Sequence, residues 1–259
     1  MGTDRLKLLV CGLLVLVIAG CDPAPKDASK PNTTVETPTK EPSKPTEANK
    51  PADSTTPATN KEVSLAQLPQ DLKTDAFEYY GLGSAKDVPL EMTDSVNKEA
   101  KTGARKVTFT GEKDGKATFT VEHTGNLSAL GTLNMSLEKD GLFTESTSLG
   151  KSSPHSLEVP TKLAPGVTWS SAEDIESDSG GKFSYKGAYR VVKEETVKTK
   201  GGDFKALYIE STGPVVQNGE SKKMFTKMWL AKGVGLVKQE LTLTDAKGAK
   251  VTIQTQVTK

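Results

Sequence analysis

The chain has 259 residues, with 34 basic and 33 acidic side chains and a formal net charge of +1. This length allows one large or two small domains, and the even mixture of charges offers no basic surface to attract nucleic acid or anionic lipid. Both cysteines lie within the first 21 residues, so the remainder has no disulfide, cysteine-bound metal or cysteine nucleophile. We therefore expect no nucleic-acid partner and a fold that depends on its core alone.

The first 20 residues have the three parts of a signal peptide in the required order. Arg5 and Lys7 form a basic region, Leu8–Ala19 is an apolar run, and small residues follow at the expected cleavage site. The apolar run is shorter than the ~20 residues needed to cross a bilayer. Residues 1–20 are therefore predicted to be a signal peptide that directs export and is then removed.

The end of this segment, Ile18-Ala19-Gly20-Cys21, resembles the lipobox of bacterial lipoproteins. The resemblance implies a diacylglycerol on the Cys21 sulfur, cleavage after Gly20 and acylation of the new amino terminus, so that the exported chain is anchored to a membrane through lipid. Two or more acyl chains give an anchor that does not readily dissociate. The alternatives are an ordinary secretory signal with an incidental cysteine, and an uncleaved anchor helix.

Asp22 bears on which envelope membrane carries the anchor. An aspartate directly after the cysteine resembles the signal that retains enterobacterial lipoproteins at the inner membrane. The rule does not hold for all bacteria, so the inner membrane is favoured and the outer membrane stays open.

Residues 21–62 comprise the lipidated cysteine and a linker. Eight of the 14 prolines lie between residues 22 and 62, among Thr, Ser, Lys, Glu and Ala. Because apolar residues are too few to offset the entropy of ordering the backbone, the linker is predicted to be disordered. It is interpreted either as a spacer that holds the folded domain away from the membrane, or as a solubilising leader of no fixed length.

Residues 63–259 are predicted to form an antiparallel β domain. Apolar residues alternate with polar ones through 107–121 on both sides of an Asp114-Gly115 turn, which is typical of a β-hairpin. The C-terminal strand alternates in the same way, and glycine-rich turns separate the other apolar runs. The predicted fold class is all-β, a single curved antiparallel sheet or half barrel of about ten strands, with a short helix or turn within Leu65–Tyr80.

A faint internal repeat leaves the organisation of this domain open. Met135–Leu142 resembles Met228–Leu236, and each segment follows a predicted hairpin. The domain is either a pair of similar meanders, about 105–150 and 182–257, or one sheet whose hairpins resemble each other because they share Lys-Gly turns.

Pro165 and the following glycine predict a tight turn that leads into a strand at Trp169. Together with Trp229–Lys238, this segment resembles a family of uncharacterised exported bacterial β domains with a Pro-Gly-x-x-Trp turn and a Trp-Tyr-Ala-x-Gly-Val-Gly-x-Val-Lys motif. The resemblance covers roughly residues 160–243, with Leu230 where the motif favours tyrosine. It implies a curved antiparallel sheet, distantly similar to lipoprotein-carrier half barrels, and it implies no substrate or catalytic residue.

Residues suited to catalysis or metal binding are few. His123 and His155 have no second ligand at metal spacing and are interpreted as surface residues. The carboxylates of residues 173–178 are interpreted as solvated, with a weak cation site as the alternative. The glycines of 81–84 and 233–235 lack the other residues of a phosphate loop. We expect no catalytic residue, no metal, no cofactor and no enzyme activity.

Four aromatic residues are candidates for lining a ligand face: Trp169, Tyr189, Tyr208 and Trp229. They are either ordinary core residues or the lining of a concave face that holds an apolar ligand. Two hypotheses follow for this lipid-anchored envelope protein. It is a non-catalytic module that binds an apolar ligand or a polypeptide, or it is a structural lipoprotein with a filled core that contacts another envelope protein. A cavity favours the first, and a filled interior favours the second.

Overall fold

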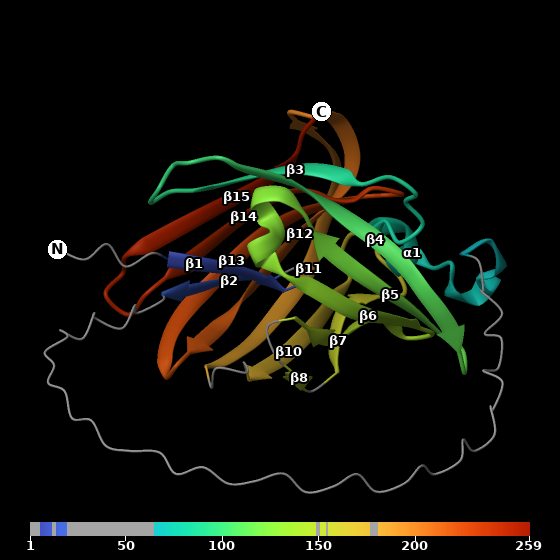
Figure 1. Cartoon of the computed structure of the whole chain (residues 1–259), viewed down its shortest axis with the longest axis horizontal. Helices are drawn as coiled ribbons and strands as arrows, with labels where there is room; N and C mark the ends of the chain where they lie inside the picture. The colour runs from blue at the N-terminus through green and yellow to red at the C-terminus, as the bar shows by residue number, and fades with distance from the viewer. Residues whose placement is uncertain (1–5, 12–13, 20–64, 149–150, 154, 177–180) are drawn as a thin grey trace, which may run out of the picture.

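The computed structural model describes residues 6–11, 14–19, 65–148, 151–153, 155–176 and 181–259. The predicted lipid-bearing Cys21 and the predicted linker, 22–62, lie outside these residues. Most of the described chain is β-strand, and Figure 1 shows the strands curving around a common interior. Among the described residues, no helix combines the length and apolar character needed to cross a membrane.

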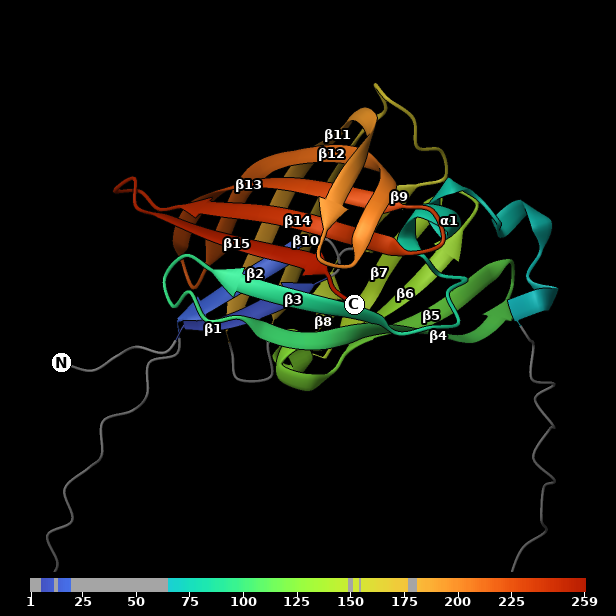
Figure 2. The same cartoon turned by 90° about the horizontal axis from the view of Figure 1, so that it is seen from above.

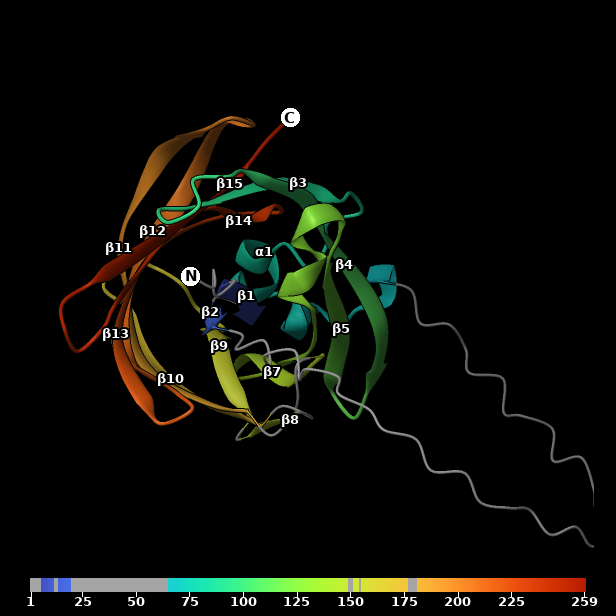
Figure 3. The ribbon, with the colours of Figure 1, turned by 60° about the vertical axis from the view of Figure 1, so that its left-hand side comes forward.

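The apolar run near the N-terminus forms two short strands. β1 (Leu6–Cys11) pairs antiparallel with β2 (Leu14–Ala19) in a small sheet separate from the main one. Figure 3 shows this hairpin inside the ring of strands, and β1 contacts the 3-10 helix η3 (Gly125–Leu130). The two described strands of the segment predicted to be a signal peptide therefore lie within the ring of strands.

Three short helices precede the main sheet. They are η1 (Leu65–Gln67), η2 (Gln70–Leu72) and α1 (Asp75–Tyr80), so the helix or turn predicted in this segment is confirmed. α1 ends at Gly81, whose φ of 71° lies in the left-handed region that glycine tolerates. Four of its six residues are buried, and Figure 3 shows α1 inside the ring of strands.

The main sheet has thirteen strands, and every neighbouring pair is antiparallel. The first six are β3 (Val88–Asp94), β4 (Lys101–Lys113), β5 (Lys116–His123), β6 (Thr132–Glu138), β7 (Gly141–Thr147) and β8 (Lys151–Ser153). The others are β9 (Ser156–Pro160), β10 (Thr168–Glu176), β11 (Lys182–Thr199), β12 (Gly202–Gln217), β13 (Glu220–Ala231), β14 (Gly235–Thr244) and β15 (Lys250–Val257).

The sheet curls until its two ends come together. The strand order is β8-β10-β11-β12-β13-β14-β15-β3-β4-β5-β6-β7-β9, and Figure 2 shows β13, β14, β15 and β3 following one another. Across the seam between β9 and β10, the hydroxyl oxygens of Ser156 and Ser171 lie 2.7 Å apart. Nearby, Trp169 Nε1 donates to the Glu158 carbonyl oxygen at 3.2 Å. The result is a nearly closed barrel (Figures 1 and 3).

The prediction of an all-β antiparallel fold is confirmed, but the half barrel of about ten strands is corrected to a nearly closed barrel of thirteen. Several of the additional strands are short, with three residues in β8 and five in β9. Alternation over so few residues does not distinguish a strand from a loop. Closure depends on side-chain contacts across the seam, which alternation within one strand cannot reveal.

One hydrophobic core extends through the whole sheet. The Asp114-Gly115 turn joins β4 to β5 as predicted, with φ values of 55° and 77° that suit a type I′ hairpin. Strands β4–β7 and β11–β15 each pair consecutively, and their buried residues form a single cluster with those of α1 and η3. The interior is therefore shared by both halves of the sheet.

Candidate functional site

Trp169 and Tyr189 stack against each other on the inner face of the sheet. They are register partners on β10 and β11, with ring centroids 4.9 Å apart and planes 10° apart. Tyr185 meets Tyr189 edge-on at 6.4 Å. Exposed fractions of 8%, 5% and 2% for Trp169, Tyr189 and Tyr185 show that the three rings form an aromatic wall toward the interior.

Tyr208 and Trp229 form a second stack on the opposite face. Tyr189 pairs with Ser211 on β12, and Tyr208 lies three positions from Ser211, so alternation turns Tyr208 outward. The Tyr208 and Trp229 centroids are 5.0 Å apart, and Lys238 Nζ lies 5.0 Å above the Trp229 ring. The four predicted aromatics therefore form an inner pair and an outer pair.

A shallow groove of about 580 Å³ crosses the outer face of β10–β13. Its lining includes Arg190, Glu210 and Thr212, together with Phe225, whose side chain is 38% exposed. Ligand sites usually enclose most of the ligand surface behind apolar walls. This groove is instead open to solvent along the outer face, with charged side chains and one exposed ring in its lining.

An enclosed cavity of about 30 Å³ lies between α1, η3 and the inner face of the sheet. Space of this size holds about two water molecules. Its walls combine leucine and valine side chains with the polar residues Arg105, His123, Gln239 and Thr255. Strand pairing sets Arg105 opposite His123 and Gln239 opposite Thr255, so polar groups from two strand pairs face the same space.

Arg105 is the buried cation of this cavity, with 5% of its surface exposed. Its Nη2 donates to the Tyr80 carbonyl oxygen at 3.4 Å and to the Val234 carbonyl oxygen. The guanidinium carbon also lies 5.8 Å from the centroid of the Tyr80 ring. Burial lowers the pKa of Arg105 from its ordinary value. Arg105 therefore ties the end of α1 to the turn between β13 and β14.

His123 lies beside Arg105 and is neutral at physiological pH. Burial lowers the pKa of His123 to about 4, the hydrogen bond to the Gly131 carbonyl opposes this shift, and the charge of Arg105 adds to it. Nδ1 lies 3.3 Å from the Gly131 oxygen, so the neutral ring carries its proton on Nδ1. Arg105 remains the charged group of the pair.

We expect the free energy of unfolding to decrease as the pH falls from about 6.5 to about 4. In this window the unfolded chain protonates His123 and the folded chain does not, since the folded pKa of about 4 lies below the ordinary 6.5. The effect is at most about 3 kcal/mol. Urea unfolding of the wild type and of His123→Gln at several pH values measures it, with His155→Gln as control. A difference between wild type and His123→Gln that does not change with pH contradicts the assignment.

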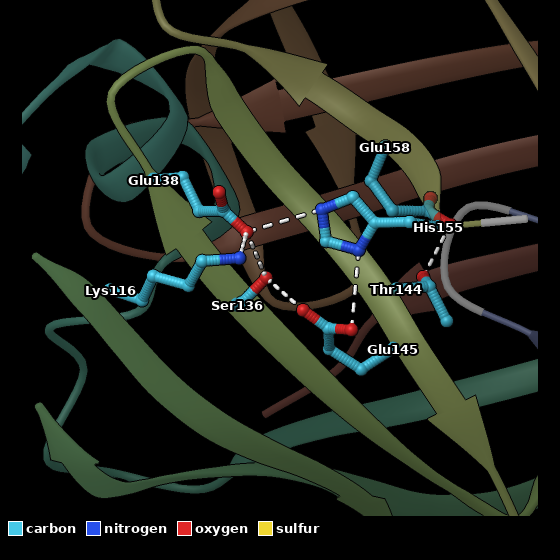
Figure 4. Close-up of polar contacts among 7 residues, drawn as sticks. All are labelled: Lys116, Ser136, Glu138, Thr144, Glu145, His155 and Glu158. Atoms are coloured by element: carbon cyan, nitrogen blue, oxygen red, sulfur yellow. Dashed lines mark hydrogen bonds and ion pairs between the residues drawn. The ribbon is translucent and has the colours of Figure 1, made fainter. Parts of the chain in front are cut away.

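A polar cluster joins β6 and β7 to His155, the residue directly before β9 (Figure 4). His155 Nε2 lies 3.1 Å from Glu138 Oε1, and its Nδ1 lies 3.2 Å from Glu145 Oε2. Ser136 Oγ is 2.9 Å from the Glu138 carboxylate and 2.5 Å from that of Glu145. Lys116 Nζ pairs with Glu138 at 2.7 Å. One lysine, one histidine and two carboxylates thus share a network of short contacts.

The chemistry of this cluster fits internal ion pairing better than metal binding. One ligand atom each of Glu138, Glu145 and His155 lies within 4.8 Å of the others. However, the Glu138 carboxylate already forms an ion pair with the Lys116 ammonium. Partial burial alone would raise the pKa of Glu138, but the hydrogen bonds from Lys116 and Ser136 outweigh burial and lower that pKa. We therefore assign the cluster a structural role, holding the start of β9 against β6 and β7.

Two residues, His123 and Glu173, differ from their interpretation in the sequence. His123, predicted at the surface, is mostly buried because the strand end packs beneath η3. His155 is exposed, in agreement with its interpretation as a surface residue, and folding brings two carboxylates to it. Glu173, predicted to be solvated, is 3% exposed because it occupies an inward position of β10, whereas Asp174 and Glu176 are exposed.

The C-terminal part of the barrel is similar in sequence to a known family. Residues 157–254 match the DUF3108-like family model. The DUF3108-like segment runs from β9 to β15 and contains both aromatic pairs. It overlaps the span of roughly 160–243 expected from the turn and strand motifs. No curated protein is significantly similar to the chain in sequence.

The fold is similar to that of one solved structure, and a second one matches less closely. A candidate lipoprotein from Parabacteroides distasonis matches with a TM-score of 0.52 and 11% identity, covering 70% of this chain and 96% of that one. A candidate exported protein with a YmcC-like fold from Bacteroides fragilis matches with a TM-score of 0.48 and 10% identity, covering 68% and 96%. At such low identity the first of these similarities establishes the fold alone.

Proposed function

We propose that this chain is an envelope lipoprotein, anchored through Cys21, whose barrel is a non-catalytic module that holds an apolar ligand. Two features support the anchor. The lipobox follows an apolar run directly, and the linker that follows it can separate a folded domain from a membrane. The proposal that the barrel binds a ligand rests on the size of the barrel.

Thirteen strands enclose more space than their own side chains fill. About eight strands make a barrel that side chains just fill, and larger barrels enclose ligands or other fillers. In this structure α1, η3 and the β1–β2 hairpin lie within the ring (Figure 3). The observation that carries the proposal is this ring of thirteen strands, part of whose interior is filled by the predicted signal peptide.

Removal of residues 1–20 takes away β1 and β2 and leaves α1 and η3 in place. The inner face that surrounds this space is apolar, as Met224, Leu241 and Ile253 illustrate, each with at most 1% of its surface exposed. Water would hydrate such a surface poorly. Once the predicted signal peptide has been removed, this surface favours an apolar ligand such as an acyl chain.

A structural lipoprotein with a filled core is the second candidate. It is favoured by the small size of the enclosed cavity, about 30 Å³. If the ring contracts after the predicted signal peptide is removed, no ligand site is left. The outer groove with Phe225 would then be a surface for another envelope protein.

Native mass spectrometry distinguishes the two candidates. The full-length chain is expressed and processed in a bacterium, and a protease site placed within residues 22–62 releases the folded domain without detergent. We expect the domain to carry an apolar small molecule in a ratio of one to one. A domain that carries nothing, and that crosslinks instead to an envelope protein, supports the filled-core alternative.

Replacement of the predicted lipid attachment residue tests the anchor. We expect Cys21→Ser to abolish incorporation of radioactive palmitate and to leave the chain at precursor size, because serine provides no thiol for the thioether. Cys11→Ser is the matched control, since Cys11 lies within the predicted signal peptide and should not carry lipid. Labelling of Cys21→Ser at the wild-type level rules out the lipid anchor at this position.

A further inference from the structure

Within the described part of the chain, the buried charge of Arg105 has no acidic partner. None of the ion pairs among the described residues involves Arg105, and its Nε is buried without a hydrogen-bond partner in that part of the chain. Its hydrogen bonds to the described residues go to the two carbonyl oxygens named above. Carbonyl dipoles compensate a guanidinium charge only in part, so burial of this cation costs free energy. An anion in the adjacent cavity would recover that cost.

The groups around the cavity suit one small anion at the end of an apolar ligand. Gln239 and Thr255 are polar and uncharged, and His123 is neutral because burial lowers its pKa to about 4. Among the residues that the structure describes, no carboxylate lines the cavity. The remaining walls are apolar side chains of the same core that continues along the inner face. A positive charge therefore adjoins an apolar interior.

We propose that Arg105 binds the carboxylate of a long-chain fatty acid whose alkyl chain occupies the barrel interior. This inference rests on the proposed function and specifies its ligand. The Nε–H of Arg105 donates to the carboxylate, forming a charge-assisted hydrogen bond where water is excluded. The cavity of about 30 Å³ matches a carboxylate, which displaces about two waters, and is too small for a phospholipid headgroup.

The position of Arg105 is held before any ligand arrives. Its Nη2 contacts to Tyr80 and Val234 fix the guanidinium, and the missing side chain of Gly235 leaves room for it. A preorganised donor loses little entropy on binding. Because the same contacts also hold α1, a variant of Arg105 can affect folding, and the test needs a measurement on the unmodified protein as well.

Calorimetric titration with two matched ligands tests the charge recognition. The domain is produced as the full-length chain, released within residues 22–62 and stripped of bound lipid on a hydrophobic resin. We expect palmitate to bind at least about tenfold more tightly than hexadecanol, which has the same chain and no charge. In Arg105→Met this preference should disappear. Arg190→Met, which changes an exposed arginine on the outer face, should retain it.

Nuclear magnetic resonance of palmitate labelled with carbon-13 at its carboxyl group tests the contact in the unmodified protein. We expect the resonance of the bound ligand to stay at its ionised position between pH 7 and about 4.5, since a cation lowers the pKa of the carboxylate beside it. A bound resonance that titrates like a solvent-exposed fatty acid overturns the assignment, whether or not Arg105→Met folds.

The outcomes separate this inference from the proposed function. Equal affinities for palmitate and hexadecanol, both saturable, overturn the role of Arg105 and leave apolar binding intact. Absence of saturable binding for both ligands overturns the proposed function and the assignment together. Tighter binding of hexadecyl phosphate than of palmitate would assign Arg105 to a phosphate and overturn the choice of a carboxylate.

Discussion

Gly235→Ala is expected to destabilise the barrel by about 3–5 kcal/mol. A Cβ at this position would overlap Arg105 Nη2 and lie 2.5 Å from the Tyr80 carbonyl oxygen. The φ of 89° adds strain for any residue other than glycine. Neither neighbour can yield easily, because Arg105 is buried and the Tyr80 oxygen belongs to the backbone at the end of α1.

Gly233→Ala is the matched control for this prediction. Gly233 lies in the same turn with a φ of 71°, and a Cβ there would meet no atom within 4 Å. We expect it to cost about 1–2 kcal/mol, from backbone strain alone. Urea unfolding followed by circular dichroism gives both values. Equal losses in the free energy of unfolding for the two variants would mean that Gly235 is needed only for the backbone conformation of the turn. The predicted close contact of Gly235 with Arg105 and α1 would then be wrong.

Trp169→Ala is expected to cost about 3–5 kcal/mol, because it removes a large buried side chain from the seam. The indole stacks on Tyr189 at 4.9 Å, and its Nε1 donates to the Glu158 carbonyl oxygen on β9. Trp169→Phe keeps an aromatic ring against Tyr189 but has no N–H for Glu158. It should cost about 1–2 kcal/mol.

The pair of substitutions at Trp169 tests closure of the barrel. Urea unfolding measures both losses, and hydrogen exchange of the β9 and β10 amides reports on the seam itself. We expect faster exchange there in Trp169→Ala than in Trp169→Phe. A loss below about 1 kcal/mol in Trp169→Ala would show that β9 and β10 do not close the barrel in solution.

Local sequence signals were sufficient for the hairpins and the class of fold. Asp114-Gly115 adopts the positive φ values of its turn type, and the alternation on both sides of it becomes β4 and β5. The end of α1 at Gly81 has a similar local cause. Such features depend on neighbouring residues alone, so one sequence contains the information.

The division of the aromatic residues between two faces could not be predicted. The face that Tyr208 occupies relative to Tyr189 depends on the register of β11 with β12, and a register shift occurs between Val191 and Lys193. A shift of one residue moves a side chain to the other face. Spacing in the sequence therefore identifies Tyr189 and Tyr208 as strand residues without stating that they lie on opposite sides.

Arg105 illustrates a signal that was present but not used. It lies in phase with Val107 and Phe109, on the alternating side of a predicted strand, which is unusual for a charged residue. The cluster of Glu138, Glu145 and His155 had no such signal, since it depends on the pairing of β7 with β9. Contacts between strands that pair around a seam require the closed structure.

The central claim, that the barrel interior holds an apolar ligand, is tested most directly by photocrosslinking in growing cells with a fatty acid that carries a diazirine near its alkyl end. Mass spectrometry of the purified protein then locates the modified residues. The account predicts saturable labelling on the inner face of β10 and β11, around Trp169 and Tyr189. Labelling confined to the outer face around Tyr208 and Trp229, or no saturable labelling, would contradict it.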